Sequence, residues 1–173
     1  MKKYLKYIIA FFSVFVIRLL PFRAPNVEPI MAVIMPFGKK YNSTSVFIFS
    51  VFSIVLFDLA TAGIGIWTLI TAIVYGLIGI GASFYFKNRS GWRNYALYAF
   101  FATIVYDALT GLTIGPLIFG QSFMVSLVGQ IPFTILHLIG NVSFAIVLSP
   151  VIERWVVKES VKTIEVEGRV LVG

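Results

Sequence analysis

The chain has 173 residues, of which 59% are hydrophobic and only 12% are charged, and its mean hydropathy is +0.95. Soluble domains carry about a quarter charged residues, so this composition excludes an ordinary soluble fold and indicates an integral membrane protein. The absence of cysteine excludes disulfides and thiolate metal sites, and the net charge of +7 comes from short basic clusters between apolar segments, which favours membrane orientation over nucleic-acid binding.

The apolar segments predict an all-α bundle of six transmembrane helices, followed by a cytoplasmic tail over residues 152–173. A membrane-spanning helix needs about 20 apolar residues. The second segment is the weakest candidate for a membrane span, because Pro25, Pro29 and Pro36 lie within or just before it and a helix of about 12 residues rises only about 18 Å. The expected helices span residues 4–22, 27–38, 42–57, 66–86, 92–108 and 122–151, all within a transmembrane domain over residues 1–151.

The basic residues predict the orientation of this bundle in a cell membrane. With six spans and the amino terminus inside, 12 of the 14 Lys and Arg residues fall on the inner side, and only Arg18 and Arg23 fall outside. If the short second segment does not cross and the amino terminus is outside, the split is 11 to 3. We expect six spans with both termini in the cytoplasm, and the five-span alternative stays open.

Acidic residues fall in the outer loops of this topology. Glu28, Asp58 and Asp107 are expected in the first, third and fifth loops, on the same face as Arg18 and Arg23. Asp58 and Asp107 would each end a helix whose dipole disfavours an anion there by about 0.3 to 1 kcal/mol. Each therefore needs a compensating donor or cation, or a role in function. Pairing with an arginine and contact with a ligand both remain open.

The fourth helix carries a packing surface and an interfacial aromatic residue. Ala72, Gly76 and Gly79 predict a close approach of a neighbouring helix. Trp67 stands at the outer start of this helix, where tryptophan commonly marks the membrane interface. Its use in stacking against a flat ligand is the alternative.

The longest uncharged stretch, residues 108–152, is expected to hold a loop before the last helix. Gly111, Gly115 and Pro116 interrupt it, so its spanning part is predicted to begin near Phe123.

The last helix carries one polar stripe. Its members follow one another at spacings of 4, 4, 3 and 4, which places them on one face of a helix: Ser126, Gln130, Thr134, His137 and Asn141. In hydrocarbon these groups need partners from other helices or from a ligand. The deeper His137 and Asn141 favour interhelical hydrogen bonds, whereas Gln130, about 12 Å inside the helix start, favours the floor of a ligand pocket.

The sequence contains no motif that indicates an enzyme. With one histidine and no cysteine there is no paired-ligand metal motif, and no serine stands in a nucleophile elbow. The Gly38 to Lys40 segment lacks the upstream glycine and the following Ser or Thr of a nucleotide loop. We therefore expect neither an enzyme nor a bound metal or cofactor.

Three loop segments resemble the substrate-binding S component of energy-coupling factor (ECF) vitamin transporters. They are Pro-Asn-Val-Glu-Pro-Ile at residues 25–30, Asp58 with Gly-Ile-Trp-Thr at 65–68, and residues 107–111 with Gly-Pro at 115–116. The resemblance covers roughly residues 4–151. It departs at the first helix, where Ala10 is followed four residues later by Val14 and not by the alanine that often meets the coupling subunit.

The resemblance implies capture of a vitamin or cofactor precursor near the outer surface. It also implies a transmembrane coupling subunit and two cytoplasmic ATPase subunits as partners, with no nucleic acid; the missing amino-terminal histidine argues against a metal-ion substrate. The expected substrate-binding residues are Asn26, Glu28, Trp67, Gln121, Gln130 and Thr134, with Arg23, Asp58, Asp107, His137 and Asn141 as secondary candidates.

The competing interpretation is a structural membrane protein similar to the six-span rod-shape-determining component. Its polar residues would then bind partner proteins and no ligand. An ion-coupled secondary carrier is weaker, since the sequence shows no broken-helix inverted repeat. Polar groups on the outer face and on the last helix favour the transporter interpretation.

Overall fold

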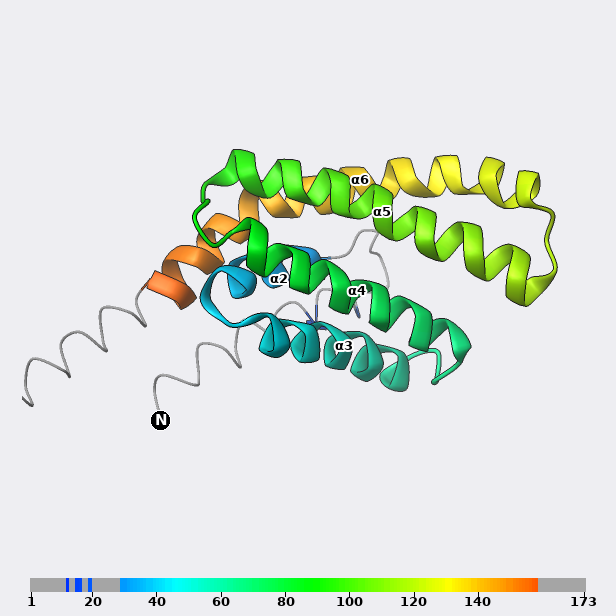
Figure 1. Cartoon of the computed structure of the whole chain (residues 1–173), viewed down its shortest axis with the longest axis horizontal. Helices are drawn as coiled ribbons and strands as arrows, with labels where there is room; N and C mark the ends of the chain where they lie inside the picture. Colours follow the sequence, from blue (N-terminus) through cyan, green and yellow to red (C-terminus); the bar gives the residue numbers. More distant parts are fainter. Residues whose placement is uncertain (1–11, 13–14, 17–18, 20–28, 159–173) are drawn as a thin grey trace, which may run out of the picture.

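The computed structural model describes residues 12, 15–16, 19 and 29–158, and these residues form helices joined by short loops, with no strand among them. Two antiparallel hairpins, α3–α4 and α5–α6, pack along one another (Figure 1). A π-helical turn continues α6 beyond its last residue. The elements are α2 (Ile30–Lys40), α3 (Ser43–Ala60), α4 (Ile66–Tyr85), α5 (Trp92–Phe119), α6 (Phe123–Ile152) and η1 (Glu153–Lys158).

The four long helices confirm the prediction of an all-α membrane protein. Among the described residues, α3, α4, α5 and the segment from Phe123 to Trp155 are long and apolar enough to cross a membrane. The first expected helix, over residues 4–22, falls almost wholly outside the described residues. The second, α2, has 11 residues and rises about 16 Å, which is about half of the hydrocarbon thickness.

The short helix α2 is the core of the molecule. Every residue from Ile30 to Gly38 is buried, and in Figure 1 the helix lies between the two hairpins in one half of the bundle. The Ser149 hydroxyl donates to the Ala32 carbonyl at 2.9 Å, which ties α2 to α6. Met31 lies with its sulfur 3.9 Å from the hydroxyl of Thr103, near the midpoint of α5. The amino terminus of α2 is therefore buried halfway along the long helices.

Small residues allow α4 to approach its neighbours closely, as the sequence predicted. A Cβ on Gly79 would lie 2.7 Å from the Ser50 hydroxyl, and one on Gly76 would lie 2.5 Å from the Phe47 ring, so both glycines face α3. On α2, Gly38 meets the other side of α4, where an added Cβ would lie 2.9 Å from backbone atoms of Ala82 and Ser83. The packing interpretation of this glycine-rich surface is thus confirmed for α3 and extends to α2.

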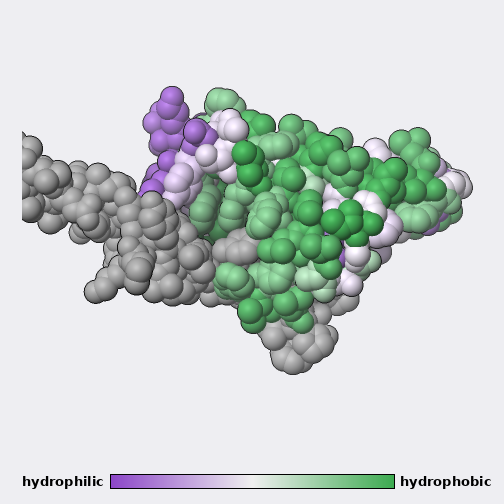
Figure 2. All heavy atoms as spheres, turned by 90° about the horizontal axis from the view of Figure 1, so that it is seen from below, coloured by the Kyte–Doolittle hydropathy of each residue, from purple (hydrophilic) through white to green (hydrophobic). Residues whose placement is uncertain are grey.

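All lysines and arginines of residues 29–158 gather at one end of the bundle, which we call the basic end. They lie at the end of α2, in the α4–α5 loop, in the first turn of α5 and in η1: Lys39, Lys40, Lys87, Arg89, Arg93, Arg154 and Lys158. An ion pair of 2.6 Å between Lys39 Nζ and Glu153 Oε1 joins α2 to η1. Figure 2 shows hydrophilic atoms concentrated toward this end and hydrophobic atoms over the flanks of the helices, as a bilayer requires.

The predicted loop after residue 108 was wrong, because α5 continues to Phe119. Gly111 and Gly115 do not break this helix: both lie against α6 side chains, Gln130 and Ser126, which would have to shift to admit a Cβ. The helix ends instead at Gly120, whose φ of 64° is the left-handed conformation that glycine adopts at helix ends. Asp107 therefore lies inside a helix and not in an outer loop.

Candidate functional site

Polar and small side chains line the contact between α5 and α6 and form what we call the polar ladder. The α5 members repeat every four residues, so they share one helix face. They oppose the stripe predicted on α6, which runs antiparallel. The contacts pair Thr103 with Asn141, Asp107 with His137, Gly111 with Gln130, and Gly115 with Ser126.

Two of these pairs, in the half of the ladder nearer the basic end, are fully buried. His137 Nδ1 lies 2.7 Å from Asp107 Oδ1, and the two side chains are only 3% and 1% exposed. One turn away, the Asn141 amide donates to the Thr103 hydroxyl at 2.9 Å, with Asn141 wholly buried. The secondary candidates Asp107, His137 and Asn141 thus come together, and Asp107 is a buried partner of histidine and not the loop residue that the sequence predicted.

Within residues 29–158, three atoms of this group find no hydrogen-bond partner: Asp107 Oδ2, His137 Nε2 and Asn141 Oδ1. The roles of these atoms follow from where the protons lie. With an ionised Asp107 and a neutral His137, Nδ1 donates to Asp107 Oδ1 and Nε2 remains as an acceptor, and in that state the three unpaired atoms all accept. Leaving such a group buried without a partner costs about 1 to 3 kcal/mol, which makes a donor from outside the group favourable.

Two aromatic rings contact the histidine, and a third packs behind one of them. Tyr106 on α5 and Phe133 on α6 meet the His137 ring edge to face, with ring centroids 5.5 Å and 5.7 Å away. Tyr75 on α4 packs on Tyr106 at 4.7 Å and is fully buried. The acceptor atoms consequently lie in an apolar, aromatic environment in which each hydrogen bond is strengthened by the low dielectric.

The outer half of the ladder is more open. The Gln130 amide donates to the Thr134 hydroxyl at 3.3 Å, and both side chains are half-buried beside an apolar hollow of about 300 Å³ between α5 and α6. A Cβ on Gly111 would lie 1.8 Å from Gln130 Oε1, so Gln130 rests directly on the α5 backbone. The Ser126 hydroxyl donates to Gln121 Oε1 at 3.2 Å, which orders the start of α6.

The remaining predicted residues that the structure describes, Asp58 and Trp67, lie in the helix ends on either side of the α3–α4 loop. The Thr68 hydroxyl donates to Asp58 Oδ2 at 2.6 Å, so Asp58 ties the last turn of α3 to the first turn of α4. Trp67 is 39% exposed, and its ring covers Gly65, where an added Cβ would overlap it. Asp58 thus lies inside a helix and has a structural partner across the loop.

The expected contacts Arg23, Asn26 and Glu28 lie outside the described residues. Within those residues, no three His, Asp or Glu side chains come together as a metal site would need. Sequence reasoning missed Thr103 and Tyr106, although the spacing of Thr103, Asp107 and Gly111 by fours was the signal of a second polar face.

Comparisons of the chain with protein-family models, with curated proteins and with solved structures gave no match. The chemistry of the site therefore has to be judged on its geometry. A buried carboxylate and imidazole that share one hydrogen bond and keep free acceptor atoms are suited to recognising a polar molecule that brings N–H or O–H groups.

Proposed function

We propose that this chain is the membrane-embedded substrate-capture subunit of an ECF-type transporter, which takes up a vitamin or cofactor precursor with energy from partner ATPases. The observation that carries the proposal is the buried group of Asp107, His137 and Asn141, with three acceptor atoms left unpaired. Polar side chains that only join helices within a membrane are expected to satisfy one another. Unpaired acceptors are what a binding site presents before its ligand arrives.

The chemistry of these atoms defines the ligand class. With an ionised Asp107 and a neutral His137, the unpaired atoms Asp107 Oδ2, His137 Nε2 and Asn141 Oδ1 all accept, so the proposed ligand donates hydrogen bonds. A flat ring fits the aromatic side chains of Tyr106 and Phe133 that border His137. We therefore propose a small heterocyclic precursor with N–H groups on its edge. We propose Trp67, Gln121, Gln130 and Thr134 as the outer approach to this site, while Asn26 and Glu28 stay predictions from the sequence because they lie outside the described residues.

The placement of α2 supports a binding site at membrane depth. Transporters build their sites from helices interrupted near the bilayer midplane, and a chain reversal at that depth is tolerated only inside the protein or beside a cavity. Helix α2 begins at Ile30, close to Thr103 on the ladder, and its N-cap residue Pro29 provides no side-chain cap. Its first turn thus brings uncapped backbone to the level of the polar group.

The charge distribution supports an inward-facing basic end. Every Lys and Arg of residues 29–158 lies there, and positively charged residues collect on the cytoplasmic side of membrane proteins. We propose six spans with both termini in the cytoplasm, so that the α3–α4 and α5–α6 loops face outward. The sequence has no nucleotide loop of its own, in keeping with ATPases and a coupling subunit as separate chains.

Exchanging one acceptor atom for a donor tests the proposal directly. Asp107→Asn keeps the oxygen that His137 faces and turns Oδ2 into an N–H₂ group, which repels a ligand donor. We expect affinity for the ligand to fall about tenfold or more, which corresponds to about 1.4 kcal/mol. Asp58→Asn is the matched control, because Asp58 in the last turn of α3 is engaged with Thr68 in the first turn of α4, and it should bind as the wild type does.

The ligand is first identified by mass spectrometry of small molecules that co-purify with the detergent-solubilised protein. Binding of that compound to the three proteins is then measured by calorimetry. Equal affinity in Asp107→Asn and wild type would exclude the buried group as the site. Failure to retain or bind any compound from a broad panel of vitamins and heterocyclic precursors would favour the structural scaffold, in which the ladder only joins helices.

A further inference from the structure

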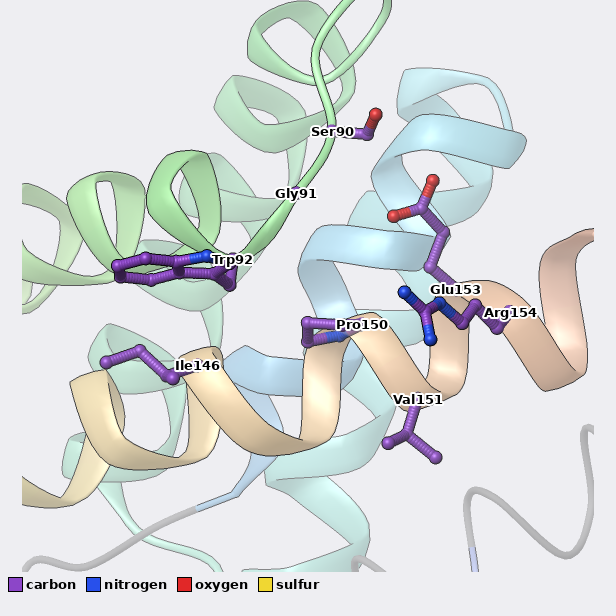
Figure 3. A pocket seen from close by; sticks show the side chains of 8 residues that line it. All are labelled: Ser90, Gly91, Trp92, Ile146, Pro150, Val151, Glu153 and Arg154. Carbon is purple, nitrogen blue, oxygen red and sulfur yellow. The ribbon is translucent and has the colours of Figure 1, made fainter.

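A second hollow lies at the basic end, far along the helices from the buried polar group. It has a volume of about 520 Å³ and opens between the start of α5 and the end of α6 (Figure 3). Ser90, Gly91 and Trp92 form one wall, while Pro150 and Arg154 belong to the opposite wall. Neither the capture of a substrate nor the polar ladder uses this cavity.

The cavity carries positive charge that is free to meet an anion. Figure 3 shows the Arg154 side chain extending beside Pro150 toward the cavity, and within the described part of the chain Arg154 forms no ion pair. The neighbouring carboxylate of Glu153 is already engaged, by Lys39 Nζ at 2.6 Å and by the Tyr95 hydroxyl at 3.0 Å. The acid in the lining therefore does not cancel the charge of Arg154.

Further positive charge stands beside the start of α5. Arg93 lies over the Trp92 ring at 5.4 Å, which holds its guanidinium group next to this helix start. The helix α5 starts after Gly91 without a side-chain cap, and its first N–H groups, ahead of those that bond to the Gly91 carbonyl, have no partner within the helix. Cationic side chains next to such a helix start favour a phosphate group.

The lining is not only polar. Trp92 is 52% exposed and Val151 is 55% exposed, and with Ile146 they continue the apolar flank of the long helices up to the cavity. A binding site for a free phosphate has no use for this apolar lining. A phospholipid needs both parts, since its phosphate lies at the membrane surface and its acyl chains run along the helices.

We propose that this cavity binds an anionic phospholipid from the inner leaflet, with its phosphate on Arg154 and Ser90 and its acyl chains along Trp92, Ile146 and Val151. Such a lipid joins the start of α5 to the end of α6 at the point where α2 is held by the Lys39–Glu153 pair. It fixes the basic end independently of whether a substrate occupies the buried group.

Native mass spectrometry of the full chain measures this binding directly. The protein is extracted with a mild detergent and titrated with phosphatidylglycerol or phosphatidylcholine, and the lipid-bound fraction is counted. We expect phosphatidylglycerol to bind with a clear first site, and Arg154→Gln to weaken that site about tenfold, because a charge-assisted hydrogen bond is lost. Arg89→Gln is the matched control, since it removes the same charge at the same end from a residue outside the cavity lining.

Three results would overturn the proposal. Equal losses in Arg154→Gln and Arg89→Gln would show only a general attraction between a basic surface and anionic lipid. Equal binding of phosphatidylcholine and phosphatidylglycerol would remove the role of charge. Displacement of the lipid by millimolar inorganic phosphate or glycerol phosphate, with no effect of acyl chain length, would identify a site for a free phosphate compound.

Discussion

At the scale of single residues, two glycines in helices have opposite surroundings. Gly38 on α2 meets the backbone of α4, where a new Cβ would lie 2.9 Å from the carbonyl carbon of Ala82 and the nitrogen of Ser83. Gly129 on α6 has nothing within 4 Å of the same position. Backbone atoms cannot move aside as a flexible side chain does, so only Gly38 is required by packing.

Gly38→Ala should therefore lower the free energy of unfolding by about 1 to 3 kcal/mol, the usual cost of overpacking a tight contact. Gly129→Ala should leave stability unchanged or raise it by up to about 1 kcal/mol, because alanine is the better helix former. Thermal unfolding of both variants in the same detergent checks the pair. A neutral Gly38→Ala would mean that α2 and α4 are further apart than described.

Asn141 differs from Gln130 in the partners that the two amides find. Asn141 is wholly buried and bonded across helices to Thr103, whereas Gln130 is half-buried and bonded within its own helix to Thr134. The sequence had assigned the deeper amide to interhelical bonding and the outer one to a pocket. The first assignment agrees with the bond to Thr103, and the second stays a prediction.

At the scale of elements, we expect energetic coupling between the facing residues of α5 and α6. Thr103→Val and Asn141→Leu, combined in a double-mutant cycle, should show a coupling of about 0.6 to 1.7 kcal/mol, the range found for hydrogen bonds between membrane helices. Unfolding in detergent is the measurement. The pair Thr103→Val and Ser53→Ala is the control and should be additive, because the Ser53 hydroxyl bonds to Phe49 within α3.

The same hairpin shows which parts of the site can be predicted from the sequence. The polar stripe of α6 was predictable, because its residues repeat at helical spacing in an otherwise apolar segment. The matching face of α5 was not, since Gly111, Gly115 and Pro116 are typical of helix interruptions, and only the packing shows that α6 side chains lie against the two glycines. Asp107 was consequently assigned to a loop. Its histidine partner is 30 residues away, and only tertiary packing brings the two together.

At the scale of the whole molecule, the charge pattern and the helix ends agree. The predicted topology placed most basic residues on one side of the membrane. In the structure, the Lys and Arg residues of 29–158 do lie at one end of the bundle. Of the five expected helices within the described residues, four are long enough to cross, whereas α2 starts halfway and ends at the basic end. Hydropathy reports how apolar a segment is, and a helix buried inside a bundle is as apolar as one that faces lipid.

Cysteine labelling of intact cells tests the proposed orientation, and the absence of native cysteine makes the readout clean. Asn88→Cys, in the loop at the basic end, should react only after the membrane is permeabilised. Ala62→Cys and Ser122→Cys, in the two loops at the opposite end, should react from outside. Labelling of Asn88→Cys in intact cells would reverse the orientation and place the proposed lipid site in the outer leaflet.

The two hairpins differ in length, and this has a consequence for the surrounding bilayer. Helices α3 and α4, with 18 and 20 residues, rise about 27 and 30 Å, which matches the hydrocarbon thickness. Helix α5 and the segment from Phe123 to Trp155, with 28 and 33 residues, rise about 42 and 50 Å. The α5–α6 hairpin must tilt, or the lipid beside it must thicken, whereas the α3–α4 hairpin fits the bilayer without either change. Among the described helices, hydrophobic mismatch therefore acts on the side of α5 and α6. This asymmetric mismatch exerts a torque on the protein, so a change in membrane thickness would alter the tilt of the bundle.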